Sequence, residues 1–343
     1  MGNNGKNRDR RVVITGLGVV SSLGIGWEPF WKNLVAGKSG ISRITTFDTS
    51  LYDRHNGGEV KDFDPKNFID RRSLRHLGRT SQMAIVASKL ALKDSGLNND
   101  QLRREITGVC VGTTMGEPQV MESLNSKYFP QGKRMRGDHV AASLYPACAI
   151  SNNVASYFKL KGPNFIFSSA CAAGNYAILH AFHLLKTGRA DYMVTGGADA
   201  LSRVAFTGFF RLFTMAPEKC QPFDKNRKGM LVGEGAGMMV MESLEEAQKR
   251  NATIYAEILG GGLACDALHM TDPSIEGISK AIQKSLDNSC VSIADIDYIN
   301  AHGTGTRGND KAESLALNKV FGKRLQNIPI SSIKSMLGHT MGA

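Results

Sequence analysis

Phe167 to Leu185 reads FSSACAAGNYAILHAFHLL, and this stretch is the most informative in the chain. Apolar residues typical of a strand lead into small residues around Cys171, and helical spacing begins after Gly174. Small neighbours allow a sharp turn and the close approach of a substrate carbonyl. A thiol at the start of a helix lies at the positive end of the helix dipole, which favours the thiolate. The pattern predicts a nucleophilic Cys171, although a small buried cysteine at a tight turn has the same local sequence.

Two histidines lie in a similar setting. His302 follows a predicted strand in NAHGTGT, and His339 follows the last predicted strand in IKSMLGH. Ligands gather at the carboxyl ends of strands in open α/β sheets. A single histidine of this kind is more often structural, but two of them and a cysteine at a third strand exit predict one shared site. The remaining histidines lack this setting and are interpreted as structural: His55, His76, His139, His180, His183 and His269.

Short β-branched or apolar runs alternate with longer helical patterns, which predicts an α/β fold. The predicted strands cover residues 11–20, 106–111, 164–168, 192–195, 254–259, 296–300 and 328–333. The predicted helices cover residues 80–97, 175–187, 275–288 and 310–321, and residues 238–250 begin as a strand and end as a helix. Because the rhythm restarts after Arg250, we expect two packed halves, residues 1–251 with the cysteine and 252–343 with both histidines.

Composition restricts the class of protein. The 343 residues are 42% hydrophobic and 21% charged, and we find no apolar run near the ~20 residues that a membrane helix needs. The six cysteines are scattered without metal-ligand spacing, and the polar, basic N-terminus is not a secretory signal, so we expect free thiols in the cytoplasm. The net charge of +11 predicts an acidic partner. Nucleic acid is disfavoured because the basic residues are dispersed and no nucleic-acid-binding module accompanies them.

Several blocks together resemble one known family. SSACAAG, PFDKNRKGMLVGEGAG, NAHGTGT followed by NDKAE, and SSIKSMLGHTMGA are similar to the signature blocks of β-ketoacyl-acyl-carrier-protein synthases, as is the opening VVITGLGVVSSLG. The order and spacing agree from residue 11 to the last residue, and the likeness is closest to the elongating type II enzymes, in particular β-ketoacyl-acyl-carrier-protein synthase II. Priming synthases carry Asn where His339 stands, thiolases use a second cysteine, and chain-length-factor relatives lack the nucleophile.

The resemblance implies a fold and a reaction. The fold is the duplicated, thiolase-like α-β-α-β-α arrangement of layers. In the reaction, Cys171 accepts an acyl chain from an acyl carrier protein, and malonyl-carrier then loses carbon dioxide while His302 and His339 donate hydrogen bonds to its thioester oxygen. The enolate attacks the acyl-cysteine, and the Cys171 N–H is expected to supply one oxyanion donor. No cofactor and no metal are implied, because the substrates arrive on phosphopantetheine.

Supporting roles also follow from the resemblance. Lys334 is expected to pair with Glu313 and to tune the histidines electrostatically, and Asp310 belongs to the same supporting group; a surface lysine and a helix glutamate are the alternative. The substrate-binding set is Thr304 and Thr306 for the pantetheine arm, and Met115 and Phe209 for the walls of the acyl pocket. Plain turn residues and apolar core are the alternatives for these four.

The positive charge suits docking of an acidic carrier protein, with a solvated charged face as the alternative. Two basic groups are expected to bind it, the first made of Arg71, Arg72 and Arg75 and the second of Lys133, Arg134 and Arg136. Family members are homodimers, and the resemblance places residues 148–161 and the strand before Cys171 at the interface.

The family continues beyond the position of Ala343 with a last helix, closing strands and a Gly/Phe-rich loop, so we expect an incomplete second half. Either the sequence is a fragment or another chain completes the fold. The leading function is fatty acid elongation. The alternatives are a polyketide or aryl-polyene ketosynthase, and a non-catalytic partner subunit, against which the intact Cys171, His302 and His339 argue.

Overall fold

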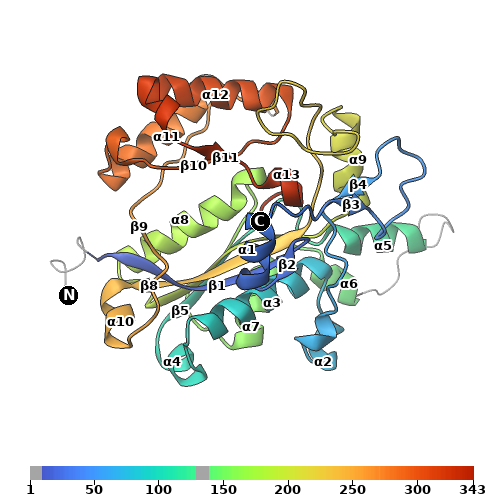
Figure 1. Ribbon diagram of the computed structural model, residues 1–343. Coiled ribbons are helices and arrows are strands. Elements are labelled where there is room, and N and C mark those ends of the chain that lie inside the picture. The colour runs from blue at the N-terminus through green and yellow to red at the C-terminus, as the bar shows by residue number, and fades with distance from the viewer. Residues whose placement is uncertain (1–9, 129–138, 270) are drawn as a thin grey trace.

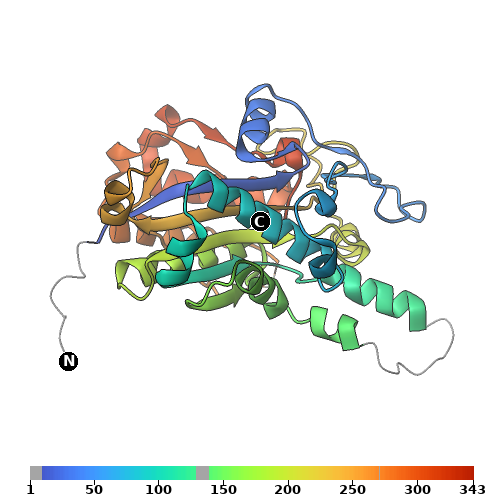
Figure 2. The same cartoon turned by 90° about the horizontal axis from the view of Figure 1, so that it is seen from below.

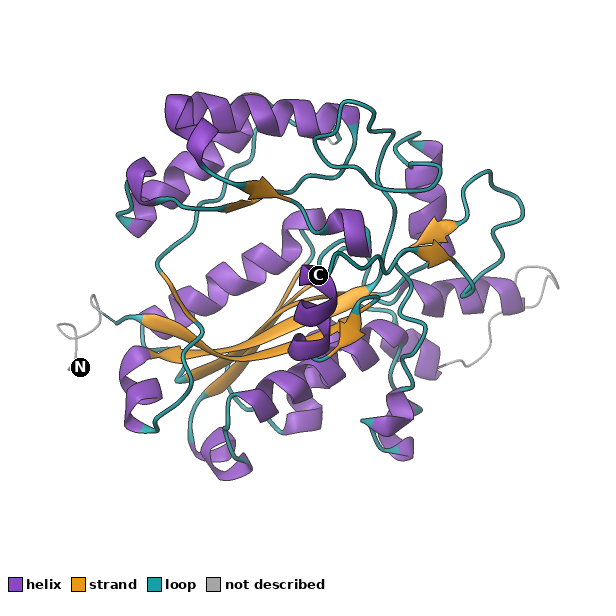
Figure 3. Cartoon of the chain, viewed as in Figure 1, coloured by secondary structure: helices purple, strands orange, loops and turns teal. Residues whose placement is uncertain are grey.

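The computed structural model describes residues 10–128, 139–269 and 271–343, which form alternating layers of helices and sheets (Figure 1). From the top of Figure 3, helices α11 (Ile275–Ser289) and α12 (Arg307–Phe321) are followed by a small sheet, helix α8 (Ala173–Lys186), a large sheet, and a bottom layer with α3 (Arg79–Asp94) and α7 (Cys148–Phe158). The predicted α-β-α-β-α fold class is confirmed.

The large sheet is mixed and contains seven strands. Its order is β2-β1-β8-β7-β5-β6, and β9 joins the same side of β1 as β2, at the other end of that strand. The bounds are β1 Val12–Ser21, β2 Gly24–Ile25, β5 Thr107–Gly112, β6 Asn164–Phe167, β7 Tyr192–Asp199, β8 Gly235–Ser243 and β9 Ala256–Ile258. β5 is parallel to β6 and β7, whereas β8 is antiparallel to β7 and β1. Because β9 comes from the second half of the sequence, this sheet joins the two halves.

The faces of this sheet are covered by different helices. α3 and α7 bury Met83, Ile85 and Ile150 completely on one face, and α8 buries Ala177 and Leu185 on the other. Fully burying a large apolar side chain stabilises a fold by about 1.5–3 kcal/mol. α3 approaches β1 closely, since a methyl group added at Gly18 would lie 1.9 Å from the carbonyl oxygen of Ala87.

The small sheet consists of β10 (Ile299–Asn300) and β11 (Ile330–Ser331), which run parallel. α11 and α12 pack on it through an apolar cluster that includes Leu317, Phe321 and Ile328. Both strands are shorter than predicted. A one-turn helix, α13 (Lys334–Leu337), separates β11 from His339, so the expectation that His339 directly follows its strand is wrong.

The remaining elements surround this core. Their bounds are α1 Trp27–Val35, β3 Ser42–Arg43, β4 Asn56–Gly57, α2 Arg71–Leu74, α4 Asn99–Arg104, α5 Pro118–Tyr128, α6 His139–Leu144, α9 Arg203–Arg211 and α10 Leu244–Lys249. In Figure 2, α5 and α6 extend from one end of the molecule and flank residues 129–138. The predicted docking residues Lys133, Arg134 and Arg136 lie in that segment, outside the described residues. No helix within the described ranges is both long and apolar enough to cross a membrane.

Candidate active site

Cys171 lies at the junction between β6 and α8. The residue before it, Ala170, has a left-handed backbone with φ of 51°, a conformation that is uncommon outside glycine and often found at functional sites. This turn starts a short 3-10 helix over Ala170–Ala172 that continues into α8. A methyl group at Gly112 of β5 would lie 2.2 Å from the carbonyl carbon of Ala173, so the first turn of α8 presses directly on the sheet.

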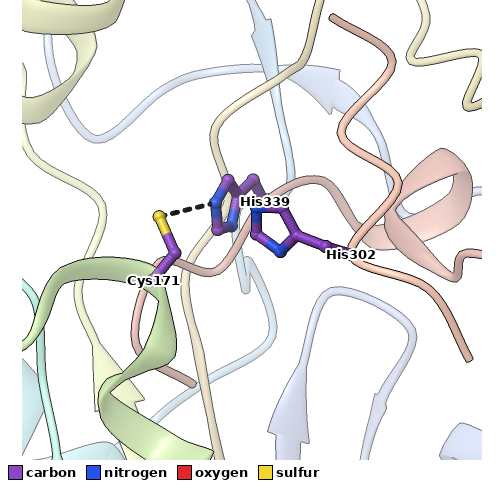
Figure 4. A group of neighbouring side chains, drawn as sticks. All are labelled: Cys171, His302 and His339. Atoms are coloured by element: carbon purple, nitrogen blue, oxygen red, sulfur yellow. Dashed lines mark hydrogen bonds between the residues drawn. The ribbon is translucent and has the colours of Figure 1, made fainter. Parts of the chain in front are cut away.

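His339 reaches the thiol from the second half of the chain. Its backbone forms a bridge beside Val232: its N–H donates to Leu231 at 2.7 Å, and its carbonyl accepts from Gly233 at 2.8 Å. The Met341 N–H donates to the ring Nδ1 at 3.1 Å, so Nδ1 is the unprotonated nitrogen and Nε2 carries the hydrogen. Nε2 lies 3.1 Å from Cys171 Sγ, as the dashed line in Figure 4 marks. His339 therefore presents an N–H to the sulfur.

His302 contributes the second imidazole. Glu313 of α12 fixes its loop by accepting the N–H groups of His302 at 2.7 Å and Gly303 at 2.8 Å. The two imidazole rings stand edge to face, with centroids 5.3 Å apart and an interplanar angle of 82° (Figure 4). The sulfur of Cys171 and one ring nitrogen from each of His302 and His339 all lie within 4.8 Å of one another. The three predicted residues thus meet at one point, while the predicted absence of a metal stays a prediction.

A cavity of about 340 Å³ lies over this triad. Its polar walls come from Asn175 at the start of α8, from Asn300 at the end of β10, and from Lys334 of α13. Glycines of β7 and β8 and residues 340–343 also line it, together with Gly174, Ile178, Ala301, Ile333 and Leu337. The cavity is large enough for a small substrate group held against the sulfur and both imidazoles.

Four predicted substrate-binding residues lie outside this lining. Met115 and Phe209 pack in a separate apolar cluster that includes Met341, which itself borders the cavity. The hydroxyls of Thr304 and Thr306 are 2.9 Å apart and pair with each other. The substrate contacts of all four residues stay predictions.

Burial sets the protonation states in the site. Desolvation raises the pKa of the Cys171 thiol, and the charge of Lys334 partly opposes this shift. The expected lowering by the helix dipole is thus outweighed by burial. Desolvation, with help from Lys334, lowers the pKa of His302 to about 4 and that of His339 well below its usual range. Both imidazoles are neutral at neutral pH and able to donate hydrogen bonds.

Asp310 and Glu313 hold the backbone of the His302 loop, and Lys334 acts through its charge. Asp310 accepts the N–H groups of Phe223 at 2.7 Å and Gly305 at 3.1 Å, so it braces the loop that follows His302. Burial lowers the pKa of Lys334, while the charges of Cys171 and Glu313 raise it. The Glu313 carboxylate accepts the N–H groups of His302 and Gly303 and the side-chain amide of Asn309 at 3.2 Å. Among the described residues it makes no direct ion pair with Lys334.

Asp199 is a site residue that the sequence motifs did not predict. It ends β7, is fully buried, and accepts hydrogen bonds from the loop after β5 and from Gly342 beside the cavity. The sequence contains a signal for it, because a carboxylate at the end of the otherwise uncharged strand YMVTGGAD is unusual. Buried charges are found where they are paired or fully hydrogen-bonded.

Comparison with known proteins agrees with this geometry. Residues 9–247 match the family described as "Beta-ketoacyl synthase, N-terminal domain", and residues 255–343 match "Beta-ketoacyl synthase, C-terminal domain". The chain belongs to the β-ketoacyl synthase family. It is a condensing enzyme whose triad is Cys171, His302 and His339.

Named relatives and solved structures resemble this synthase over most of its length. It is 37% identical to "3-oxoacyl-[acyl-carrier-protein] synthase 2" of Staphylococcus aureus (strain COL), over 98% of this chain and 83% of that protein. A structure described as "The ishigamide ketosynthase/chain length factor" is 42% identical with a TM-score of 0.94, over 97% of this chain and 83% of that one. A type II polyketide synthase acyl-carrier protein in complex with its ketosynthase bound to the hexaketide, AntDE:AntF, is 30% identical with a TM-score of 0.87 and the same coverage.

Replacing Lys334 by Met is expected to move the pH profile of Cys171 alkylation to higher pH. The buried ammonium lowers the pKa of the thiol, so its removal raises that pKa and reduces the thiolate at neutral pH. If the pKa of the thiol rises by one, the thiolate is destabilised relative to the thiol by about 1.36 kcal/mol. At a pH below that pKa, the fraction of thiolate and hence the alkylation rate then fall about tenfold. The measurement is the rate of iodoacetamide addition to the Cys171 peptide against pH by mass spectrometry.

The matched control is Lys323→Met, which removes an exposed lysine in the 3-10 turn after α12. It is expected to leave the profile unchanged. If the alkylation rate of Lys334→Met instead rises at the same pH as in the wild type, or at a lower pH, the electrostatic role of this lysine is contradicted.

Proposed function

We propose that the synthase is a 3-oxoacyl-[acyl-carrier-protein] synthase that elongates carrier-bound acyl chains by decarboxylating Claisen condensation with malonyl-carrier. The observation that carries the proposal is the His339 Nε2 hydrogen aimed at Cys171 Sγ across 3.1 Å, with the neutral His302 ring beside it. A thiolate is the nucleophile, and two neutral N–H donors suit an oxygen that gains negative charge.

Acylation is the first half-reaction. The Cys171 thiolate attacks the carbonyl carbon of the acyl thioester, a new C–S bond forms, and the bond to the carrier's sulfur breaks. The carrier leaves as its thiolate and takes a proton from solvent. The His339 N–H and the Lys334 charge stabilise the Cys171 thiolate against the burial that disfavours it.

Condensation is the second half-reaction. The malonyl thioester oxygen accepts hydrogen bonds from His302 and His339, the bond to the carboxylate breaks, and its electron pair forms the enolate as carbon dioxide leaves. The enolate carbon attacks the acyl-Cys171 carbonyl, with the Cys171 N–H as one oxyanion donor. A C–C bond forms, the C–S bond breaks, and the thiolate returns. Loss of one such donor typically raises a barrier by about 2.7–4 kcal/mol.

The other predicted residues complete the proposal. Lys334 tunes the three titratable groups through its charge, and Glu313 and Asp310 hold the loop of His302 in place. Thr304 and Thr306 are proposed to exchange their mutual hydrogen bond for bonds to the pantetheine arm. Their loop follows His302 directly, which places it near the site.

Met115 and Phe209 are proposed to line the acyl pocket. They belong to an apolar cluster that meets the cavity at Met341 and includes the fully buried Phe206. An acyl chain on Cys171 that passes Met341 would run into this cluster and bury its methylene groups there. Each buried methylene group stabilises binding by about 0.8 kcal/mol.

Fatty acid elongation is the first proposed pathway, supported by the 3-oxoacyl-[acyl-carrier-protein] synthase from S. aureus. A polyketide ketosynthase is the second candidate, favoured by the 42% identity to the ishigamide ketosynthase/chain length factor and by the ketosynthase bound to a hexaketide. The same chemistry serves both pathways. They differ in the chain that Cys171 accepts.

We propose a dimer whose interface includes α7 and the edge strand β6. β6 ends the sheet order, and Phe165 on it is 41% exposed. An open sheet edge with an exposed aromatic residue suits pairing with another chain. A second copy is the first expected partner, and a chain-length-factor type subunit is expected if the polyketide pathway applies.

Acylation of Cys171 tests the function. Incubation with acyl-carriers of several lengths is expected to add the acyl mass to the Cys171 peptide, and malonyl-carrier is then expected to release a β-ketoacyl-carrier two carbons longer. Cys171→Ala is expected to abolish the adduct, whereas Cys290→Ala, at an exposed cysteine after α11, is expected to keep it. A saturated chain extended once supports fatty acid elongation, and repeated unreduced extension supports the polyketide pathway. No adduct with any chain length would contradict both.

We propose that the exposed group Arg71, Arg72 and Arg75 docks the acidic carrier protein. All three side chains lie on or next to α2, which Asp70 caps by accepting the N–H groups of Arg72 and Ser73. Changing the three arginines to Glu is expected to raise the Michaelis constant for acyl-carrier with little change in kcat, most strongly at low salt. Steady-state kinetics at two salt concentrations measures this.

The matched control reverses Lys280, Lys284 and Lys323, three exposed lysines of the α11/α12 layer, and makes the same change in net charge. It is expected to leave the Michaelis constant near that of the wild type. Equal effects of the two triple variants would mean that net charge alone, and not this surface, attracts the carrier.

A further inference from the structure

We propose that Asp199 is a positioning residue that holds the neutral His339 ring in its Nε2–H tautomer by fastening the Met341–Gly342 turn, and that it fixes the Thr113–Met115 loop with the same carboxylate. The proposal rests on the hydrogen bonds around one fully buried side chain at the end of β7. Asp199 does not line the cavity, so it acts through other residues.

Each oxygen of the carboxylate accepts two hydrogen bonds. Oδ1 accepts from the Thr113 hydroxyl at 2.8 Å and the Met115 N–H at 3.0 Å. Oδ2 accepts from the Thr114 N–H at 2.7 Å and the Gly342 N–H at 2.7 Å. The Thr113 hydroxyl itself accepts from the Gly116 N–H, so its own hydrogen points to Asp199. Burial raises the pKa of Asp199, and the hydrogen bonds from these four donors oppose that shift by favouring the ionised carboxylate.

The Met341–Gly342 turn is held in a narrow slot. A methyl group at Gly197 of β7 would lie 2.0 Å from the Gly342 carbonyl oxygen, and one at Gly174 of α8 would lie 2.7 Å from it. A methyl group at Gly342 would meet Asp199 Oδ2 at 2.8 Å. The backbone of Met341 is left-handed, with φ of 59°, a conformation that persists only when its surroundings enforce it. The turn is closed by the Ala343 N–H, which donates to the Thr340 carbonyl at 3.1 Å, and the hydrogen bond from Gly342 to Asp199 ties it to the end of β7.

The Met341–Gly342 turn determines which ring nitrogen of His339 carries the hydrogen. The Met341 N–H occupies Nδ1, which leaves the ring hydrogen on Nε2 facing Cys171. Without that donor, a neutral imidazole is free to carry its hydrogen on Nδ1 and to present a bare nitrogen to the substrate oxygen. Such a ring repels the developing negative charge, so the donor role of His339 depends on the turn and hence on Asp199.

The same carboxylate couples the two substrates. Met115 contacts the apolar cluster proposed for the acyl chain, while Gly342 borders the cavity in which malonyl-carrier would react. Asp199 therefore positions Met115 in the wall of the proposed acyl pocket, and through Gly342 it orients the His339 N–H in the cavity. Loss of its charge is expected to affect the rate of the chemical step more than the affinity for the carrier.

The test compares Asp199→Asn with the wild type by ¹⁵N NMR of histidine-labelled protein, with His339→Asn used to assign the His339 signals. The wild type is expected to show a protonated Nε2 and a bare Nδ1 at His339. Asp199→Asn places an amide NH₂, which is a donor, against backbone N–H groups, and so it weakens the hold on the Met341–Gly342 turn. His339 in this variant is expected to show a mixture of the Nδ1–H and Nε2–H tautomers. The variant is also expected to slow decarboxylation of malonyl-carrier about tenfold to a hundredfold in kcat, with the Michaelis constant unchanged, as misplacement of a reacting group does.

Glu242→Gln is the matched control. Glu242 is a fully buried carboxylate at the opposite end of the same sheet, where it accepts from the Thr15 hydroxyl at 2.6 Å and pairs with Arg250. It is expected to lower the melting temperature without changing the His339 tautomer. If Asp199→Asn does not fold, Thr113→Val decides, since it removes one donor to the carboxylate and is expected to slow kcat about threefold, as the loss of one hydrogen bond implies.

The proposal is overturned if the folded Asp199→Asn variant, or Thr113→Val in its place, keeps the wild-type tautomer of His339 and a kcat within about twofold of the wild type. A change of about twofold is smaller than the loss of one hydrogen bond would cause. It is also overturned if Glu242→Gln changes the tautomer equally, because the effect would then be general destabilisation. The NMR readout needs no substrate, so its result stands whether or not the proposed pathway is correct.

Discussion

The contact between His339 Nε2 and Cys171 Sγ is the interaction on which the rest of this molecule depends. Its two partners come from different halves of the chain: Cys171 from the turn that starts α8, and His339 from the segment just after α13, both of which are labelled in Figure 1. A 3.1 Å contact between such distant residues requires both sheets, both connecting turns and the helix between them to be placed together. The large sheet provides this placement because β9, from the second half, adds to β1 of the first.

Close backbone approach is the means by which the fold brings these groups together. Gly112, Gly174 and Gly197 leave room for the start of α8 and for the Gly342 carbonyl, and larger side chains there would separate the thiol from the imidazole. The same dense packing removes water from the site. Desolvation then keeps both histidines neutral and works against the thiolate, so the N–H of His339 and the charge of Lys334 are needed to offset it.

Much of this was predictable from the sequence, because strands, helices and strand-exit residues leave local patterns. Cys171, His302 and His339 each follow an apolar run and lie among glycines or other small residues, and the α/β layers follow from the alternating patterns. Other features depend on contacts between distant segments. The helix dipole alone predicts a low thiol pKa, yet burial raises it, and the residues that surround the thiol come from both halves. α13 and the role of Asp199 likewise depend on tertiary packing that no local spacing encodes.

The central claim is that two neutral imidazoles act together on one substrate oxygen. Release of carbon dioxide from malonyl-carrier, measured for the wild type, His302→Ala, His339→Ala and the double variant, tests it most directly. Residues that act as a unit show non-additive losses. The account predicts that each single variant loses most of the activity and that the double variant loses little more than either. A double variant whose loss equals the product of the two single losses would contradict it, because the two histidines would then act independently.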